Sequence, residues 1–191
     1  TILGKVARLN VVITDVQTFT EDDFESYKSL LGRLSEKVER LYVSGRSPQL
    51  NLLTDRMLLD QMNNCGAGET TITLAPDGRF YVCPAFYQSA EGYAVGDLEH
   101  GIDIKNQQLY RLDHAPICRN CDAWQCRRCV WINRLTTLEV NTPSHEQCVV
   151  AHLERNQAMK LLKRLKAKGF GFDQEIKEID YLDPFTIRHE W

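Results

Sequence analysis

Four of the seven cysteines in this chain lie within twelve residues, as two C-x-x-C pairs separated by four residues. The pairs are Cys118 with Cys121 and Cys126 with Cys129, and few apolar residues stand between them. A C-x-x-C pair can direct two sulfur atoms at one metal, whereas cysteines packed in a core follow the periodicity of a helix or strand. We therefore expect the chain to be a scaffold that carries cysteine sulfur to metal.

The other three cysteines, Cys65, Cys83 and Cys148, stand on both sides of this segment. Seven is an odd number, so a framework of disulfides would leave one thiol over, and nothing else in the sequence indicates secretion. Clustered cysteines in a reducing compartment bind metal more often than they remain plain thiols. Seven sulfurs are too many for one tetrahedral site, so the simplest division gives four ligands to one centre and three to another.

The composition excludes several classes of function. The chain has 191 residues, of which 43% are hydrophobic and 26% charged, as in a globular protein of one domain or two small ones. Its net charge of -3 argues against nucleic acid as the main partner, because binding phosphates requires an excess of basic residues. We see neither a membrane span nor a signal peptide, and we expect a cytoplasmic protein.

Local patterns predict an α+β chain that begins with a β-α-β unit. A strand is expected over residues 8–13, where three β-branched residues stand in a row. A helix follows from Thr20, which is placed to cap it ahead of three acidic residues. A second strand is expected over residues 40–44, and such a unit favours parallel strands with a right-handed crossover. A short helix is expected over residues 55–62.

The middle of the chain is expected to be a small β-hairpin followed by loops. Strands over residues 70–74 and 79–82 would flank a turn in which Gly78 takes a positive φ. Cys83 would then stand at the end of the second strand. Short helices are expected over residues 105–112 and 124–136.

The clearest helix is expected to begin after Ser144 and to end before Gly169. Ser144 and Gln147 fit a capping box, and glycine suits the end of a helix. Cys148 falls in the first turn, where the positive end of the helix dipole favours a thiolate. An acidic tail follows, and it can fold back onto the basic second half of this helix.

In chain order, the cysteines and one glycine form the pattern Cys65-x12-Gly78-x4-Cys83, then Cys118-x2-Cys121-x4-Cys126-x2-Cys129, then Cys148. This pattern resembles the SPASM domain, the auxiliary cluster-binding extension of radical S-adenosylmethionine (radical SAM) enzymes. That family follows C-x(9–15)-G-x(4)-C, then C-x(2)-C-x(5)-C-x(3)-C, then C. The first part agrees with the family pattern, and the last two spacings of the central part are each one residue shorter.

The resemblance implies three parts of the chain. Residues 1–62 would be the terminal βα part of the partial barrel found in radical SAM enzymes. Residues 63–170 would be the metal cluster domain, closed by the long helix, and residues 171–191 an acidic C-terminal tail. The first residue is Thr1 rather than Met, and we expect the radical SAM domain to precede this chain.

The resemblance also implies two [4Fe–4S] clusters as cofactors. One would be held by four cysteines and the other by three: Cys118, Cys121, Cys126 and Cys148 for the first, and Cys65, Cys83 and Cys129 for the second. The short spacing between Cys126 and Cys129 puts this division in doubt, because residues at i and i+3 on a helix share a face and both could bind one centre.

The segments around Cys65 and Cys83 are similar to those of peptide maturases, in particular to the group that acts on small peptides with cysteine at every fourth residue. The C-x(3)-C-x(2)-C motif that binds the S-adenosylmethionine-cleaving cluster is absent. The resemblance therefore implies a part of an oxidoreductase that is inactive alone and contributes no catalytic side chain. Its clusters would transfer electrons or bind a ribosomally made peptide substrate.

Zinc is the alternative metal, because four thiolates suit zinc as well as iron–sulfur clusters. Zinc ribbons separate their two C-x-x-C pairs by roughly 15–20 residues, and four residues match this poorly. A zinc-stabilised peptide-binding module without redox chemistry is therefore the second hypothesis, and zinc could also replace iron lost in air. The three-cysteine centre lacks a fourth thiolate, which leaves a substrate thiolate or a local residue such as Glu69 or His114 as the fourth ligand.

Overall fold

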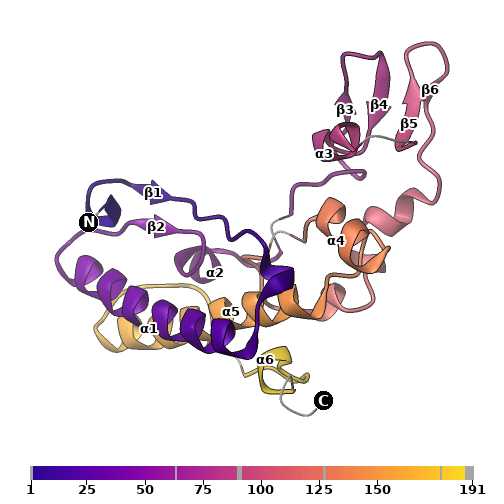
Figure 1. Cartoon of the computed structure of the whole chain (residues 1–191). Coiled ribbons are helices and arrows are strands. Elements are labelled where there is room, and N and C mark those ends of the chain that lie inside the picture. Colours follow the sequence, from indigo (N-terminus) through magenta and orange to yellow (C-terminus); the bar gives the residue numbers. More distant parts are fainter. Residues whose placement is uncertain (1, 63, 90–91, 127, 177, 188–191) are drawn as a thin grey trace. The chain divides into compact units, whose positions relative to one another are not determined.

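A computed structural model of the chain describes every residue except 1, 63, 90–91, 127, 177 and 188–191 (Figure 1). The chain forms two compact units. The first unit contains Thr1–Asn63, Asp122–Cys126 and His145–Trp191, and the second contains Asn64–Cys121 and Arg127–Ser144. Within the described residues, no helix combines the length and the apolar character that crossing a membrane requires.

The first unit begins with the expected β-α-β arrangement. Strand β1 (Arg8–Leu9) pairs in parallel with β2 (Gln49–Leu50), and α1 (Glu21–Val43) lies between them in the chain. The predicted strand over residues 8–13 is confirmed only at its start. It stops because the Asn51 side chain binds the Val11 backbone, with Oδ1 accepting from the N–H and Nδ2 donating to the carbonyl, both at 2.8 Å.

Helix α1 starts as predicted and ends later than predicted. The Thr20 hydroxyl accepts from the Asp23 N–H, and the Asp23 carboxylate accepts from the Thr20 N–H at 2.8 Å, which completes a capping box. The strand predicted over residues 40–44 is wrong, because α1 continues through Val43. Tyr42 follows Val38 at helical spacing and is buried like it, and this burial outweighs the weak β preference of the segment.

Helix α5 (His145–Ala167) packs side by side with α1 (Figure 1) and confirms the predicted long C-terminal helix. It starts directly after Ser144, and Gly169 follows its end with a φ of 86°. The two helices bury their apolar faces together with α2 (Thr54–Leu58). Buried residues of this core include Phe24, Leu31, Val38, Leu53, Met57, Val149, Leu153, Leu161, Leu162 and Leu165. The predicted helix over residues 55–62 is thus shorter and starts one residue earlier.

The C-terminal residues fold back onto the first unit, as expected. Phe170, Phe172 and Phe185 pack against its core, and the Lys166 ammonium donates to the carbonyl of Gln174. A short helix, α6 (Pro184–Ile187), follows. The contact therefore depends on phenylalanine side chains and on this hydrogen bond to the backbone. Two 3-10 turns, η1 (Ile2–Gly4) and η2 (Val16–Thr18), complete the first unit.

The second unit contains a four-stranded antiparallel sheet with the order β3-β4-β5-β6. The strands are β3 (Thr73–Leu74), β4 (Arg79–Tyr81), β5 (Ala94–Asp97) and β6 (Gly101–Ile102). The predicted hairpin is confirmed, with shorter strands. Gly78 has a φ of 78°, and its N–H donates to the carbonyl of Ala75 at 3.0 Å. Helix α3 (Pro84–Gln88) follows directly after Cys83.

Two predicted helices of the second unit differ from the structure. The helix expected over residues 124–136 begins only at Val130, as α4 (Val130–Thr137), because Arg128 has a φ of 38° and interrupts helical geometry. The helix expected over residues 105–112 is replaced by two 3-10 turns that follow Asn106, which has a φ of 51°. These turns are η3 (Gln107–Tyr110) and η4 (Leu112–His114), and a third, η5 (Cys118–Asn120), follows.

The α+β class is confirmed, and the compact units are divided differently from the three predicted parts. The second unit begins at Asn64, next to the expected boundary between residues 62 and 63. Helix α5, which we expected to close the metal domain, belongs to the first unit, and so does the tail. The physical reason is that the apolar face of α5 is matched by the apolar face of α1.

Candidate metal centre

Three cysteines of the second unit, Cys65, Cys83 and Cys129, come from separate segments of the chain, and two of them lie near enough to Cys83 to affect the pKa of its thiol. The pKa of the Cys83 thiol is raised, first by burial and to a smaller extent by the neighbouring thiols of Cys129 and Cys65. These are the three cysteines that the resemblance assigns to one centre. All three belong to the second unit.

Cys65 precedes a tight loop that the backbone closes on itself. The carbonyl of Gly66 accepts from the N–H groups of Glu69, Thr70 and Thr71 at 3.0, 2.8 and 3.0 Å. Gly66 has a φ of 66°, which glycine adopts without strain. The carbonyl of Cys65 accepts from the Thr71 hydroxyl at 3.3 Å. This loop holds the exposed Cys65 in place although the segment has no regular secondary structure.

Cys83 and Cys129 both stand immediately before helices, α3 and α4. The backbone N–H groups of Ala85 and Phe86 face the Cys83 thiol and favour its ionised form, which partly offsets the effect of burial on its pKa. The carbonyl of Cys129 accepts from the N–H of Asn133 at 2.9 Å, in the first turn of α4. Both sulfurs are half-buried, as expected of metal ligands that remain accessible.

Aromatic side chains form a cluster next to Cys83. The ring of Phe86 lies 5.5 Å from that of Tyr93 and 4.9 Å from that of Trp131, and both pairs meet edge to face. Cys83 packs against the same small core. Tyr93 and Trp131 are remote from Cys83 in the sequence. No sequence signal links them to Cys83, because sheet pairing and α4 bring them together.

The structure does not supply an obvious fourth ligand for these three cysteines. Among the described residues, no group of three or more His, Cys, Asp and Glu side chains is arranged to hold one metal ion. Glu69 is exposed, and the His114 ring contacts the Asp113 carboxylate at 2.8 Å.

Cys118 and Cys121 also belong to the second unit, in and after turn η5. The Cys121 N–H donates to the carbonyl of Cys118 at 3.1 Å, so the pair is held by a tight turn. Burial raises the pKa of the Cys118 thiol to about 11, and the Cys121 thiol adds to this effect while Arg128 opposes it. The Cys118 sulfur is therefore protonated at neutral pH unless a metal displaces the proton.

Cys126 and Cys148 belong to the first unit. Cys148 lies in the first turn of α5, as predicted, and Cys126 ends the short segment Asp122–Cys126. The four cysteines assigned to the other centre are therefore divided into two pairs, one in each unit. This division was not visible in the sequence, where Cys121 and Cys126 are separated by four residues only.

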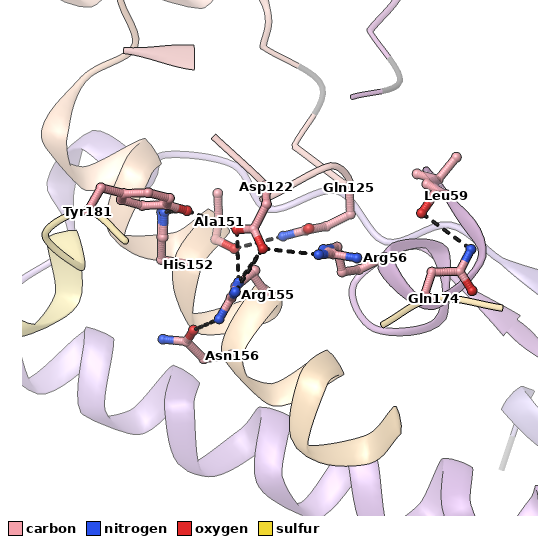
Figure 2. A network of polar contacts seen from close by, with 10 residues as sticks. All are labelled: Arg56, Leu59, Asp122, Gln125, Ala151, His152, Arg155, Asn156, Gln174 and Tyr181. Carbon is pink, nitrogen blue, oxygen red and sulfur yellow. Dashed lines mark hydrogen bonds and ion pairs between the residues drawn. The ribbon is translucent and has the colours of Figure 1, made fainter. Parts of the chain in front are cut away.

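Asp122, the residue after Cys121, is the centre of a buried polar network in the first unit (Figure 2). Arg155 donates to both of its carboxylate oxygens, with distances from 2.7 to 3.2 Å. Arg56 donates to Oδ2 at 3.0 Å, and the Tyr181 hydroxyl donates to Oδ1 at 2.9 Å. These donors lower the pKa of the Asp122 carboxyl although burial alone would raise it. Sequence analysis did not single out any of these residues.

The network continues from Tyr181 to the backbone of Cys148. Nε2 of His152 lies 3.0 Å from the Tyr181 hydroxyl (Figure 2). Its Nδ1 lies 2.8 Å from the carbonyl of Cys148. The Tyr181 hydroxyl has a single hydrogen, which Asp122 receives. The oxygen of this hydroxyl is then left to accept from Nε2 of His152.

Comparisons with models of protein families and with curated proteins found no match to this chain. The metal assignment therefore depends on the cysteine pattern and on the geometry above.

Proposed function

We propose that this chain is the auxiliary iron–sulfur region of a radical SAM enzyme that modifies a ribosomally made peptide. Cys65, Cys83 and Cys129 would hold one [4Fe–4S] cluster. Cys118, Cys121, Cys126 and Cys148 would hold the other. The radical SAM domain itself would be a separate part of the enzyme, because the C-x(3)-C-x(2)-C motif is absent from this sequence.

The observation that carries this proposal is the approach of Cys65 and Cys129 to Cys83. The three residues are far apart in sequence, in a loop, before α3 and before α4. The thiols of Cys65 and Cys129 contribute to the raised pKa of Cys83. Because like charges disfavour ionisation, three neighbouring thiolates would be unfavourable without a metal. A bound metal cluster would remove that conflict by binding the thiolates.

A bound iron–sulfur cluster would supply one-electron transfer and an iron site open to a soft ligand. The residues of this chain would position and protect it. Phe86, Tyr93 and Trp131 would exclude water from one side, which tunes a reduction potential. The N–H groups of Ala85 and Phe86 would stabilise the Cys83 thiolate. With three protein thiolates, the fourth position suits a cysteine thiolate of the peptide substrate, or else a local residue such as Glu69 or His114.

Metal analysis tests the proposal. After anaerobic reconstitution, about eight irons and matching sulfide per chain are expected for two four-iron clusters. Cys65→Ser, Cys83→Ser and Cys129→Ser should each remove the same half of the iron, and Cys118→Ser and Cys148→Ser the other half. The reconstituted chain alone should not cleave S-adenosylmethionine. Two bound zinc ions under the same conditions, with no iron retained, would instead support a zinc-stabilised peptide-binding module.

A further inference from the structure

The segment Asp122–Cys126 belongs to the first unit, although the residues on both sides of it belong to the second. It has little regular structure of its own and is held by side chains. The Cys126 N–H donates to the carbonyl of Ala123 at 2.9 Å, which bends the segment into a turn. The position of Cys126 in the first unit therefore depends on what anchors these five residues.

Asp122 provides the strongest anchor. Its carboxylate accepts hydrogen bonds from Arg155 on α5, from Arg56 on α2 and from Tyr181 in the C-terminal segment (Figure 2). The two arginines are buried, with 5% and 2% of their surface exposed. Removing one partner of such a buried ion pair is strongly destabilising, because the remaining charges stay buried without compensation. Asp122 therefore connects three parts of the first unit that are remote in sequence.

Two further side chains of the segment are anchored to the same elements. Gln125 donates from Nε2 to the carbonyl of Ala151 on α5 at 2.7 Å (Figure 2). The guanidinium of Arg56 lies over the ring of Trp124, 3.8 Å from its centre. Ala151 is three residues after Cys148, almost one helical turn along α5. The residue before Cys126 is thus tied to the helical turn that follows Cys148.

We propose that Asp122 is a positioning residue that holds Cys126 in register with Cys148 before any metal binds. Through Tyr181 and His152, the same carboxylate is connected to the backbone carbonyl of Cys148. Asp122 thus fixes both ends of this pair: the segment that ends at Cys126 and the first turn of α5. The expected effect of Asp122 on metal retention rests on the proposed function. Its expected effect on the segment 122–126 of the metal-free chain does not.

The charge of the network suits this role. Arg56 and Arg155 bring two positive charges and Asp122 one negative charge into the interior. Within the described part of the chain, Nε and Nη1 of Arg56 are buried without a hydrogen-bond partner. The Asp122 carboxylate is therefore the acid that the two buried arginines share, and its removal would leave both positive charges in the interior without it.

The test compares Asp122→Asn and the milder Tyr181→Phe with a control variant. Glu39→Gln is the control, because Glu39 forms an ion pair with Arg164 at 2.6 Å in the same unit, away from the cysteines. After anaerobic reconstitution, Asp122→Asn should release the iron of one centre to a chelator about 10–100-fold faster than the unaltered chain, and Tyr181→Phe about tenfold faster. The other centre should keep its rate. Glu39→Gln should change neither rate.

Hydrogen exchange on the metal-free chain provides a readout without metal. The amides of residues 122–126 should exchange at least tenfold faster in Asp122→Asn than in Glu39→Gln. Unchanged exchange in this segment would overturn the inference, and so would unchanged iron release in both Asp122→Asn and Tyr181→Phe. If Cys126→Ser and Cys148→Ser retain all the metal of the unaltered chain, the proposed function fails for this centre. The hydrogen-exchange experiment then tests the positioning role of Asp122 by itself.

Discussion

Glu154 is a buried acid whose protonation should control the stability of the first unit. It lies on α5, where it accepts from the Tyr27 hydroxyl at 2.7 Å and from Nε2 of Gln125 at 3.4 Å. Burial raises its pKa from 4.5 to about 7. Between these values the folded chain keeps a proton that the unfolded chain loses, so the free energy of unfolding falls as the pH rises through this window.

Glu154→Gln should remove this pH dependence. The glutamine stays neutral, so at pH 8 the variant should avoid a penalty on the order of 3 kcal/mol that the ionised acid imposes on the folded state. Urea unfolding at pH 5 and pH 8 measures the difference. Glu36→Gln, at an exposed position of α1, is the matched control and should keep the original pH dependence. If the unfolding free energy changed equally between pH 5 and pH 8 in the unaltered chain and in both variants, Glu154 would not be buried as described.

Gly68 is expected to tolerate no side chain. Its φ is 81°, and a Cβ there would lie 2.6 Å from the ring of Tyr110. Gly101 in the same unit has a similar φ of 79° but open space around it. A substitution at Gly101 therefore measures the cost of backbone strain alone, without a steric clash. Gly68→Ala should cost about 3 kcal/mol of unfolding free energy and Gly101→Ala about 1 kcal/mol. Chemical denaturation followed by tryptophan fluorescence measures both losses of unfolding free energy. Equal losses in Gly68→Ala and Gly101→Ala would contradict the steric clash at Gly68.

At the scale of elements, helix α1 depends on its capping box. Thr20→Ala removes the hydroxyl that accepts from the Asp23 N–H, and a lost cap of this type costs about 1 kcal/mol. Asp22→Ala, one position away in the first turn, loses only its interaction with the helix dipole and should cost less than half as much. Thermal unfolding of both variants measures the difference. A larger effect of Asp22→Ala would show that charge, rather than the cap, starts the helix.

Elements with strong local signals were predicted well, and elements decided by distant partners were not. Thr20, Gly78 and Gly169 act within a few residues of themselves, so their roles could be read from the sequence. The error over residues 40–44 arose because Tyr42 is buried against the later Phe170 and Phe172, which local propensity does not contain. The late start of α4 has a similar cause, since Asp122–Cys126 is held by arginines 33 and 66 residues away.

The candidate site shows the same limit. Spacing was enough to single out all seven cysteines as candidate ligands, and their grouping into two centres stays a prediction. The side chains around the cysteines were out of reach of the sequence. Asp122 is an ordinary aspartate in the sequence, and only the fold brings Arg56, Arg155 and Tyr181 to it.

At the scale of the whole molecule, removing metal should affect the two units unequally. The larger apolar core among the described residues belongs to the first unit, and the second unit has a small one around Val82, Phe86 and Val130. Under the proposed function, metal binding supplies much of the folding free energy of the second unit. A chelator should therefore expose residues 64–121 to protease while α1 and α5 keep their helical circular dichroism.

Two outcomes would contradict this expectation. Unchanged proteolysis of residues 64–121 in excess chelator would show that the second unit folds without metal. Loss of the α1 and α5 signal at the same chelator concentration would show that the first unit does not hold independently of metal.

The chain passes between the two units four times, and this sets the order in which a ribosome can deliver them. Every residue of the second unit has been synthesised by Ser144, before most of α5 exists. Helix α1 is made early, and its apolar face lacks its main partner until about residue 165 has emerged. Although domains generally fold from the N-terminus onward during synthesis, here the N-terminal unit must be completed last. A nascent chain that stops before α5 therefore leaves the apolar face of α1 without these contacts.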